Sequence, residues 1–327
     1  MEILLTGGAG YIGSHVALSL IDQGHNLTII DNLSTGNKKI LPKNINFINC
    51  DVNDENKVST ILKNKTYDVL MHFAGFVVVE ESVQNPKKYF KNNTNNAIKL
   101  FEICYKNNLK NIVFSSTAAV YGNPKNNLKI TESENLKPIN PYGESKLKTE
   151  KYLLDNRNKY NSIILRYFNV AGADINQRTG LISKNATHLI KILSEVAVGK
   201  REKIQIFGND YNTPDGTAIR DYIHVSDLSD IHVEVAKFLN EKKISHIFNC
   251  GYGNGYSVKE VIDKANEITN GSIKYEFINR RSGDPEKLVS NVDKIHKFIN
   301  WKPKYNNLST IIKSSIDWEK KINEENL

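Results

Sequence analysis

Tyr142 and Lys146 stand four residues apart near the middle of the chain, in the run N-P-Y-G-E-S-K. On a helix this spacing puts both side chains on one face, about one turn apart. A tyrosine hydroxyl alone is a weak base, since its reference pKa is about 10. A lysine cation within about 4–6 Å stabilises the phenolate and lowers that pKa. Such a pair can exchange a proton with a sugar or alcohol hydroxyl near neutral pH, although the same spacing also occurs on solvated helices.

A matching cofactor site stands at the amino terminus. The apolar run at residues 2–6 leads into the segment from Gly7 to Gly13, which contains G-x-G-x-x-G, and an amphipathic segment follows. Glycines permit the tight turn, the approach of a pyrophosphate and close packing of helix on strand. The phosphates would rest on the helix N-terminus. Asp31 ends the next apolar run, where a carboxylate accepts a ribose 2′-hydroxyl and repels a 2′-phosphate, so NAD is predicted rather than NADP.

The elements that must position these residues alternate between strands and helices. Apolar and alternating runs predict strands at 2–6, 27–31, 46–50, 68–73, 111–116 and 162–168. Amphipathic runs predict helices at 12–23, 54–63, 86–107 and 142–157. This order predicts an α/β fold with a Rossmann-type doubly wound parallel sheet, in which ligands bind at the carboxyl ends of the strands.

After residue 168 the pattern breaks into longer loops and shorter elements. We expect residues 1–170 to form an NAD-binding domain and residues 171–327 a smaller mixed α/β substrate-binding domain. A segment around 221–250 is expected to return to the first domain.

Composition restricts the class of protein. The chain has 327 residues, and no apolar run approaches the 18 or more residues of a membrane span. The first strand begins at residue 2, so no signal peptide is expected. Cys50, Cys104 and Cys250 are widely spaced within apolar runs, which suggests buried thiols and a cytoplasmic protein. No histidine has metal-ligand spacing, so no metal is expected. The net charge of +8 is scattered among asparagines, which argues against a nucleic-acid site.

Motifs along nearly the whole chain carry a resemblance to the extended short-chain dehydrogenase/reductase family, and within it to the UDP-glucose 4-epimerases. Besides the residues above, the motifs that carry this resemblance are Thr6–His15, Asp31-Asn32-Leu33, His72–Gly75, Phe114–Gly122, Pro141–Lys146, Arg166–Asn169, Phe207–Tyr211, Arg220–Val225 and Arg280–Asp284.

The resemblance implies a reaction and roles for three residues. Tyr142 would take the proton from the sugar 4-hydroxyl while C4 passes a hydride to tightly bound NAD. The 4-keto sugar would then turn over and receive the hydride on its opposite face, which interconverts UDP-galactose and UDP-glucose. Lys146 would lower the tyrosine pKa and hold the nicotinamide ribose, and Thr117 would hydrogen-bond the reacting oxygen.

The resemblance also implies the ligand contacts. The cofactor contacts would be Gly7, Gly10, Tyr11, Ile12, Gly13, Asp31, Asn32, Asp51, Val52, Phe73, Ala74, Gly75, Asn92, Ser115, Tyr142, Lys146 and Phe168. The UDP-sugar contacts would be Thr117, Tyr142, Asn169, His188, Leu189, Phe207, Arg220, Arg281 and Asp284. Guanidinium groups suit phosphate oxygens, whereas Phe73 and Phe168 fit plain core positions equally well. A homodimer is expected, with the helices at 86–107 and 142–157 pairing across a two-fold axis.

Two departures and several rivals remain open. Val77 stands where some relatives have a lysine near the cofactor, and Leu288 stands where residue size sets the room around the sugar C2 substituent. Leucine is intermediate, so a UDP-N-acetylglucosamine or dual-specificity 4-epimerase is the alternative. A 4,6-dehydratase would need an acid after Thr117, where Ala118 and Ala119 stand. An oxidoreductase that releases NADH rests on fold alone, and a non-catalytic NAD-binding protein would not need Thr117, Tyr142 and Lys146.

Overall fold

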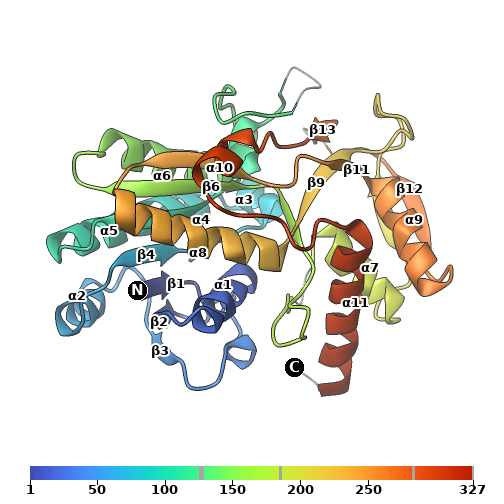
Figure 1. Ribbon diagram of the computed structural model, residues 1–327. Helices are drawn as coiled ribbons and strands as arrows, with labels where there is room; N and C mark the ends of the chain where they lie inside the picture. Colours follow the sequence, from blue (N-terminus) through green and yellow to red (C-terminus); the bar gives the residue numbers. More distant parts are fainter. Residues whose placement is uncertain (125–128, 184–185, 282–283, 326–327) are drawn as a thin grey trace.

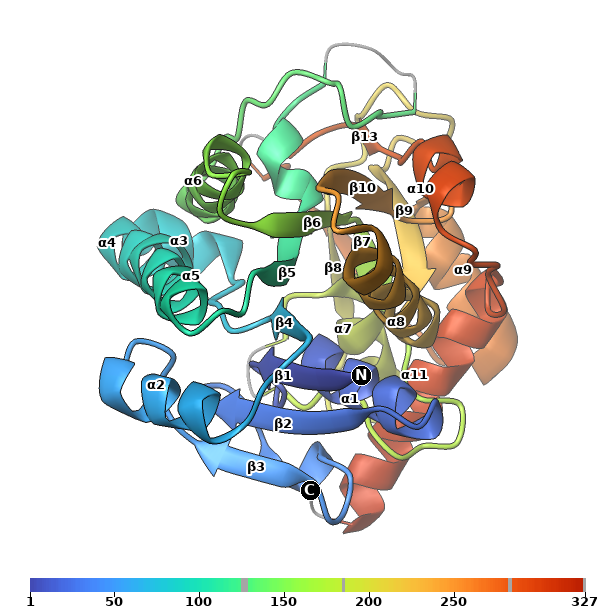
Figure 2. The same ribbon diagram turned by 60° about the vertical axis from the view of Figure 1, so that its left-hand side comes forward.

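A seven-stranded parallel sheet forms the centre of the molecule in the computed structural model, which describes residues 1–124, 129–183, 186–281 and 284–325. The strand order is β10-β6-β5-β4-β1-β2-β3 (Figures 1 and 2). These strands are β1 (Glu2–Thr6), β2 (Asn26–Asp31), β3 (Asn46–Asn49), β4 (Val69–His72), β5 (Asn111–Thr117), β6 (Asn161–Tyr167) and β10 (His246–Cys250). The order reverses direction between β1 and β4, and such a switch point opens a crevice at the carboxyl ends of the strands.

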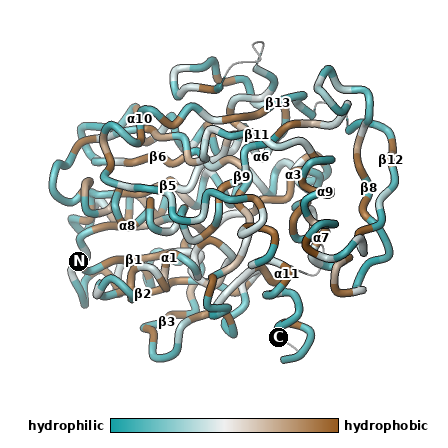
Figure 3. Tube along the Cα trace, turned by 45° about the vertical axis from the view of Figure 1, so that its right-hand side comes forward, coloured by the Kyte–Doolittle hydropathy of each residue, from teal (hydrophilic) through white to brown (hydrophobic). Residues whose placement is uncertain are grey.

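Helices cover both faces of this sheet, as its nearly continuous apolar strands require. On one face α1 (Tyr11–Asp22) packs beside α8 (Val225–Lys242). On the other face lie α2 (Glu55–Asn64), α5 (Ala97–Lys106) and α6 (Pro141–Asp155) (Figure 2). Along the tube of Figure 3, hydrophobic brown concentrates on the central strands and on the inner sides of the helices. The Rossmann-type fold predicted from the sequence is confirmed.

The segment predicted as one helix at 86–107 contains an interruption. It consists of α4 (Pro86–Tyr89), a π-helical stretch η2 (Phe90–Asn96) and α5. The short helix α3 (Val79–Gln84) precedes it, and its connection to β4 follows the carboxyl end of that strand. Wide π turns of this kind often lie at functional sites. The other predicted strands and helices are present with ends within two residues of the expected positions.

Smaller sheets build the remainder of the chain. The strand β9 (Ile219–His224) pairs with β7 (Asn169–Ala171), β13 (Lys287–Leu288) and the antiparallel β11 (Gly255–Ser257). A separate pair consists of β8 (Ile204–Phe207) and β12 (Tyr275–Ile278). Around them lie α7 (Leu189–Ala197), α9 (Val258–Thr269) and α11 (Leu308–Glu325), whereas α10 (Asp293–Phe298) packs against β10 of the large sheet. The elements η1 (Lys38–Ile40) and η3 (Ala118–Tyr121) are short 3-10 turns.

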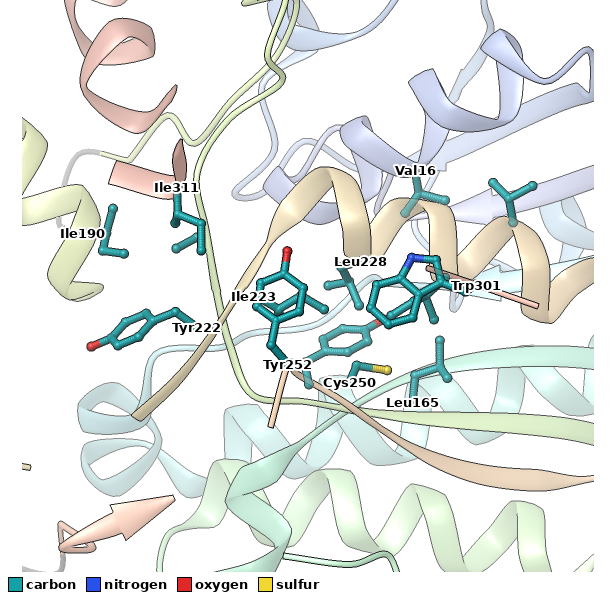
Figure 4. Packing of buried hydrophobic residues seen from close by; sticks show 14 of the residues in the cluster. Val16, Leu165, Ile190, Tyr222, Ile223, Leu228, Cys250, Tyr252, Trp301 and Ile311 are labelled. Carbon is teal, nitrogen blue, oxygen red and sulfur yellow. The ribbon is translucent and has the colours of Figure 1, made fainter. Parts of the chain in front are cut away.

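One apolar core extends from the large sheet into this remainder. Figure 4 shows Val16 of α1 and Leu228 of α8 in the same cluster as Ile190 of α7 and Ile311 of α11. Because β9 leads directly into α8, and α8 into β10, the smaller sheets are joined to the edge of the large sheet by continuous chain. The carboxyl ends of β4, β5 and β6 therefore lie on a well-packed framework.

Candidate active site

The glycine turn between β1 and α1 has no room for side chains. Gly7 has a φ of +74°, and a Cβ there would lie 2.4 Å from the backbone nitrogen of Ala74. A Cβ at Gly13 would lie 2.3 Å from the carbonyl oxygen of Gly7. Gly10 is the N-cap of α1 and supplies no side-chain hydrogen bond to the helix. The backbone N–H groups at this helix end are therefore not capped by Gly10 and can receive an anion.

Asp31 stands at the carboxyl end of β2, next to this turn. Its carboxylate accepts the Ala9 N–H at 2.9 Å and the Leu33 N–H at 2.8 Å, and the residue is only 8% exposed. Burial raises the pKa of the Asp31 carboxyl, and the two backbone hydrogen bonds oppose that rise. Each carboxylate oxygen keeps a lone pair that can accept a hydroxyl.

Two pockets lie near the glycine turn. One gathers Asp31, Asn32, Asp51, Val52, Ala74, Gly75 and Asn92 from the prediction, together with Ser34, Thr35, Cys50 and Phe76, which sequence reasoning missed. The other gathers the predicted Tyr11, Asn169, His188 and Leu189, together with Val170, Ala171, Gly172, Leu181, Ile190, Lys191, Tyr222 and Ser315. The Tyr11 hydroxyl donates to the Gly172 carbonyl at 2.6 Å and so joins the start of α1 to the loop after β7.

Helix α6 begins at the carboxyl ends of β5 and β6 for a local reason. The Asn140 side chain accepts the Gly143 N–H at 2.8 Å, and Pro141 occupies the first turn, so both residues favour a helix start here. One turn later, the Lys146 ammonium donates to the Ser115 carbonyl at 2.8 Å. The same ammonium lies 5.0 Å from the centre of the Phe114 ring. Lys146 is therefore fixed against β5.

Thr117 and Tyr142 meet at this end of β5. The ring of Tyr142 is half-buried, and burial raises the pKa of its hydroxyl, while a hydrogen bond from Thr117 lowers it. Burial lowers the pKa of Lys146 to about 8, and the charge of Glu150 opposes that shift. The lowering of the Tyr142 pKa by Lys146, expected from the sequence, stays a prediction. The hydrogen bond that counteracts burial of the tyrosine comes from Thr117, whereas Lys146 is bonded to the Ser115 backbone.

The residues predicted to contact the UDP-sugar form two ionic or aromatic contacts with one another. Arg220 of β9 pairs with Asp284 at 2.6 Å. The exposed Arg281 guanidinium lies 3.6 Å from the centre of the Phe207 ring. Arg220 and Arg281 are thus occupied by protein partners, and the Phe207 face expected to cover a uracil is covered by an arginine. Within the motif Arg280–Asp284, positions 282 and 283 lie outside the described residues.

Leu288 connects this group with the end of β5. Its Cα pairs with Arg220 in the β13–β9 ladder, while its side chain packs against a small apolar cluster. That cluster contains Ala118, Val120, Tyr121, Ile130, Leu147 and Phe168. Phe168 is 6% exposed within it, and the Phe73 ring lies 4.9 Å from the His232 ring. Both phenylalanines therefore have packing partners of their own.

Comparison with known proteins agrees with this geometry. Residues 3–251 match the model of the NAD dependent epimerase/dehydratase family. The chain belongs to that family. It is 44% identical to a UDP-glucose 4-epimerase of Azospirillum brasilense, in an alignment that covers 99% of this chain and 93% of the relative.

Two solved structures in this family are also similar to the chain. The UDP-Glc/GlcNAc 4-epimerase of Campylobacter jejuni has 43% identity, a TM-score of 0.84 and coverage of 98% of this chain and 99% of that chain. The UDP-glucose 4-epimerase of Bifidobacterium longum, solved with NAD+ and UDP, has 35% identity, a TM-score of 0.91 and coverage of 98% of each chain.

The residues present fit the NAD on which the family depends. The turn at Gly7 and Gly13 leaves no space for a Cβ, the start of α1 has no side-chain cap, and Asp31 presents a buried carboxylate beside it. No group of three or more His, Cys, Asp and Glu side chains within the described ranges is arranged to hold a metal ion. In the same part of the chain, no helix is long and apolar enough to cross a bilayer.

Proposed function

We propose that this member of the family is a UDP-glucose 4-epimerase that interconverts UDP-galactose and UDP-glucose through a 4-keto intermediate, with tightly bound NAD. The observation that carries the proposal is the meeting of Tyr142, Thr117 and Lys146 at the carboxyl end of β5. This end faces the crevice at which nucleotides bind in doubly wound sheets. The relatives at 35–44% identity are named as UDP-sugar 4-epimerases, which supports the same substrate class.

Tyr142 acts on the sugar 4-hydroxyl. Its phenolate takes the proton from that group and becomes the hydroxyl, which returns the proton after the sugar has turned over, so no net proton is released. Thr117 hydrogen-bonds the same 4-oxygen and keeps it beside Tyr142. Lys146, mostly protonated at neutral pH with a pKa of about 8, favours the phenolate from one turn away. When bound, NAD supplies a hydride acceptor at C4 and, once reduced, a hydride donor to either face of that carbon.

The remaining residues divide between the two ligands. We assign the dinucleotide to the Gly7–Gly13 turn and to the pocket around Asp31, and Ser115 to the nicotinamide side. The UDP-sugar is assigned to Asn169, His188, Leu189 and Phe207, with Arg220 and Arg281 on its phosphates and Asp284 on its ribose. In this proposal residues 1–170 form the NAD domain and residues 171–327 the UDP-sugar domain, with the segment around 221–250 returning to the first. The β10–β6 pairing supports that return.

Dehydration is disfavoured at this site. A 4,6-dehydratase needs an acid directly after the Thr117 position, and the side chains there are the methyl groups of Ala118 and Ala119. Ala118 is buried in the apolar cluster, and the Ala119 N–H donates to Thr117. Neither residue can donate the proton for elimination of water.

A second candidate is 4-epimerisation of UDP-N-acetylglucosamine in addition to UDP-glucose. Leu288 supports it, because this half-buried side chain packs against the apolar cluster that contains Ala118, the residue after Thr117. A leucine leaves more room next to a sugar C2 substituent than an aromatic side chain would. The C. jejuni relative that is 43% identical is a UDP-Glc/GlcNAc 4-epimerase.

We also propose that two copies associate through the outer faces of α5 and α6. These helices lie together on one side of the sheet (Figure 2), and Tyr105 of α5 exposes 37% of its surface there. Three free, buried cysteines suit the reducing cytoplasm. In that compartment the reaction would join galactose use to the UDP-glucose pool. Light scattering of the purified protein tests the dimer directly, and a monomer at micromolar concentration would contradict it.

The experiment that tests the activity uses purified protein with no added NAD. UDP-galactose and UDP-N-acetylgalactosamine are incubated in separate tubes, and the sugar signals are followed by NMR. We expect UDP-glucose in the first tube, because the protein retains the NAD that the reaction needs. Product in both tubes supports the dual-specificity candidate, and no product in either tube after addition of NAD contradicts the proposal.

A further inference from the structure

Helix α6 carries a third side chain in line with Tyr142 and Lys146. Glu150 stands four residues after Lys146, so the three follow one another along the face that α6 turns to the sheet. Each of them meets one of the last three residues of β5. Glu150 makes its contact by accepting a hydrogen bond from the hydroxyl of Ser116. A buried carboxylate therefore contacts the same end of β5 as Tyr142 and Lys146 do.

Glu150 is fully enclosed and has a cationic partner. It is 0% exposed, and Arg166 of β6 is 1% exposed. The Arg166 Nη2 donates to Glu150 Oε2 at 2.6 Å, and Nε lies 3.1 Å from Oε1 and 3.2 Å from Oε2. Because two guanidinium nitrogens bond both carboxylate oxygens, the position and the orientation of the carboxylate relative to β6 are fixed.

The other side of Arg166 extends the network to further elements. Its Nη1 donates to the Tyr121 hydroxyl at 3.0 Å and to the Glu132 carbonyl at 3.2 Å. The Tyr121 hydroxyl in turn donates to Asn249 Oδ1 at 2.6 Å. The Glu150–Arg166 pair therefore joins α6 to β5, β6, β10 and the turn η3 that follows Thr117.

A buried pair of this kind adds little net stability, because the loss of hydration offsets much of the attraction. The pair does define one position of α6 relative to β6, because a shift of the helix would separate Glu150 from Arg166 and leave both charges unpaired. We infer that Glu150 is a positioning residue for the epimerase reaction, which holds α6 in register with β5 and keeps the Lys146 ammonium charged beneath Tyr142. The inference deepens the proposed function and rests on it for its effect on turnover.

The surroundings of Lys146 support an electrostatic part of this role. The charged or titratable groups with an electrostatic effect on or from Lys146 are Glu150 on α6 and His72 on β4, and Tyr142 stands one turn earlier on α6. His72 is buried with a pKa of about 3, so it is neutral, and the Phe114 ring and the Ser115 carbonyl of β5 carry no charge. Glu150 is thus the anion that opposes the burial of Lys146. Its removal should lower the pKa of Lys146, and the charged form should be lost at a lower pH.

The test compares Glu150→Gln with the wild-type enzyme. We expect the alkaline limb of the kcat profile to move down by about one pH unit, while bound NAD is retained. The pKa of Lys146 is measured separately from its 13Cε resonance, identified by its loss in Lys146→Arg. That titration should move down by about the same amount. An unchanged alkaline limb together with an unchanged Lys146 titration would overturn the inference.

The double variant Glu150→Gln/Arg166→Met keeps the inference testable if the single variant does not fold. It removes both charges and leaves no unpaired arginine. If Glu150 positions Lys146 and keeps it protonated, Lys146 of the double variant still titrates at a lower pH than in the wild type. If the pair only stabilises the fold, the double variant regains the wild-type titration and profile, which overturns the inference.

Asp227→Asn is a matched control. Asp227 is a fully buried carboxylate of α8 that accepts hydrogen bonds from the Lys304 and Tyr305 backbone, away from α6. The substitution should lower the melting temperature without moving the alkaline limb of the kcat profile. A shift of that limb as large as the shift in Glu150→Gln would overturn the inference. If wild-type protein turns over no UDP-sugar while the Lys146 titration still responds to Glu150→Gln, the proposed function fails and the electrostatic part of the inference stands.

Discussion

The end of β5 and the group around Arg220 differ in how their functional side chains are held. The second group consists of Arg220, Asp284, Arg281 and Phe207. At β5 the Lys146 ammonium is buried, bonded to the Ser115 carbonyl, and lies one turn above the enclosed Glu150. In the second group Arg281 is exposed over the Phe207 ring. The comparison suggests that the reacting groups are fixed before substrate arrives, whereas the nucleotide contacts form by exchange of protein partners for ligand. Each prediction below bears on that difference.

The largest effect is expected at the fixed end. Tyr142→Phe removes the hydroxyl that exchanges the proton but keeps the ring, so turnover of UDP-galactose should fall by about 10³-fold or more. Bound NAD, measured after denaturation of the purified protein, should be retained. Activity within tenfold of the wild type would remove Tyr142 from its assigned role.

Tyr89→Phe is the matched control for that change. The Tyr89 ring lies 6.4 Å from the Tyr142 ring, and its hydroxyl donates to the Val78 carbonyl at 2.6 Å. Loss of that hydrogen bond should lower stability by about 1 kcal/mol and leave turnover nearly unchanged. Equal losses in the two variants would mean that this region is sensitive to any missing hydroxyl.

Gly13→Ala should separate cofactor retention from chemistry. The added Cβ would meet the Gly7 carbonyl at 2.3 Å, so the turn that faces the pyrophosphate must shift. We expect the affinity for NAD to fall by more than about tenfold, a penalty above 1.4 kcal/mol, so that the purified protein contains less NAD than the wild type. Gly24→Ala provides the control, because nothing lies within 4 Å of its Cβ and only backbone strain is added. Normal NAD content in Gly13→Ala would contradict the assigned pyrophosphate position.

The fixed region was also the more predictable of the two from sequence. The glycine turn, Asp31 and the Tyr142–Lys146 spacing are local patterns, and the strands and helices that carry them follow hydrophobic periodicity. Periodicity does not report one extra residue in a helical turn, so the π-helical stretch η2 was missed. The hydrogen bond by which Thr117 lowers the pKa of Tyr142 joins β5 to α6, so it becomes visible only when the strand and the helix are placed together.

The second group depends on contacts between segments distant in sequence. Nothing local to Arg281 indicates that it lies on Phe207, or that Arg220 pairs with Asp284 across the gap of 64 residues. The burial of Glu150 depends on a distant contact as well. Its partner Arg166 lies on β6, and a glutamate is almost never fully buried unless it is paired.

Arg220→Gln is expected to weaken substrate binding more than chemistry. Loss of a charge-assisted contact to phosphate costs about 1.5–3 kcal/mol, so KM for UDP-galactose should rise by roughly 10- to 100-fold. The variant also leaves Asp284 without its cationic partner, and Arg220→Lys keeps that charge as a control. A fall in kcat with unchanged KM would contradict the separation between the two regions.

Arg281→Gln should have the smallest effect. Its exposed contact with the Phe207 ring is worth about 0.5–1 kcal/mol, and that contact must be broken before Phe207 can cover a uracil. In the variant the Phe207 ring is already free to cover the uracil, which partly offsets the lost phosphate contact. We therefore expect KM to change by less than about tenfold. Steady-state kinetics with UDP-galactose measure the change, and a rise in KM larger than that of Arg220→Gln would reverse the ranking.

The central claim is that C4 gives up its hydrogen and regains it inside one closed site. UDP-galactose with deuterium at C4 tests this directly in ordinary water, with purified protein and no added NAD. The account predicts UDP-glucose that retains deuterium at C4, as measured by NMR and mass spectrometry. Loss of that deuterium to solvent would mean that C4 is deprotonated and reprotonated, and it would contradict the account.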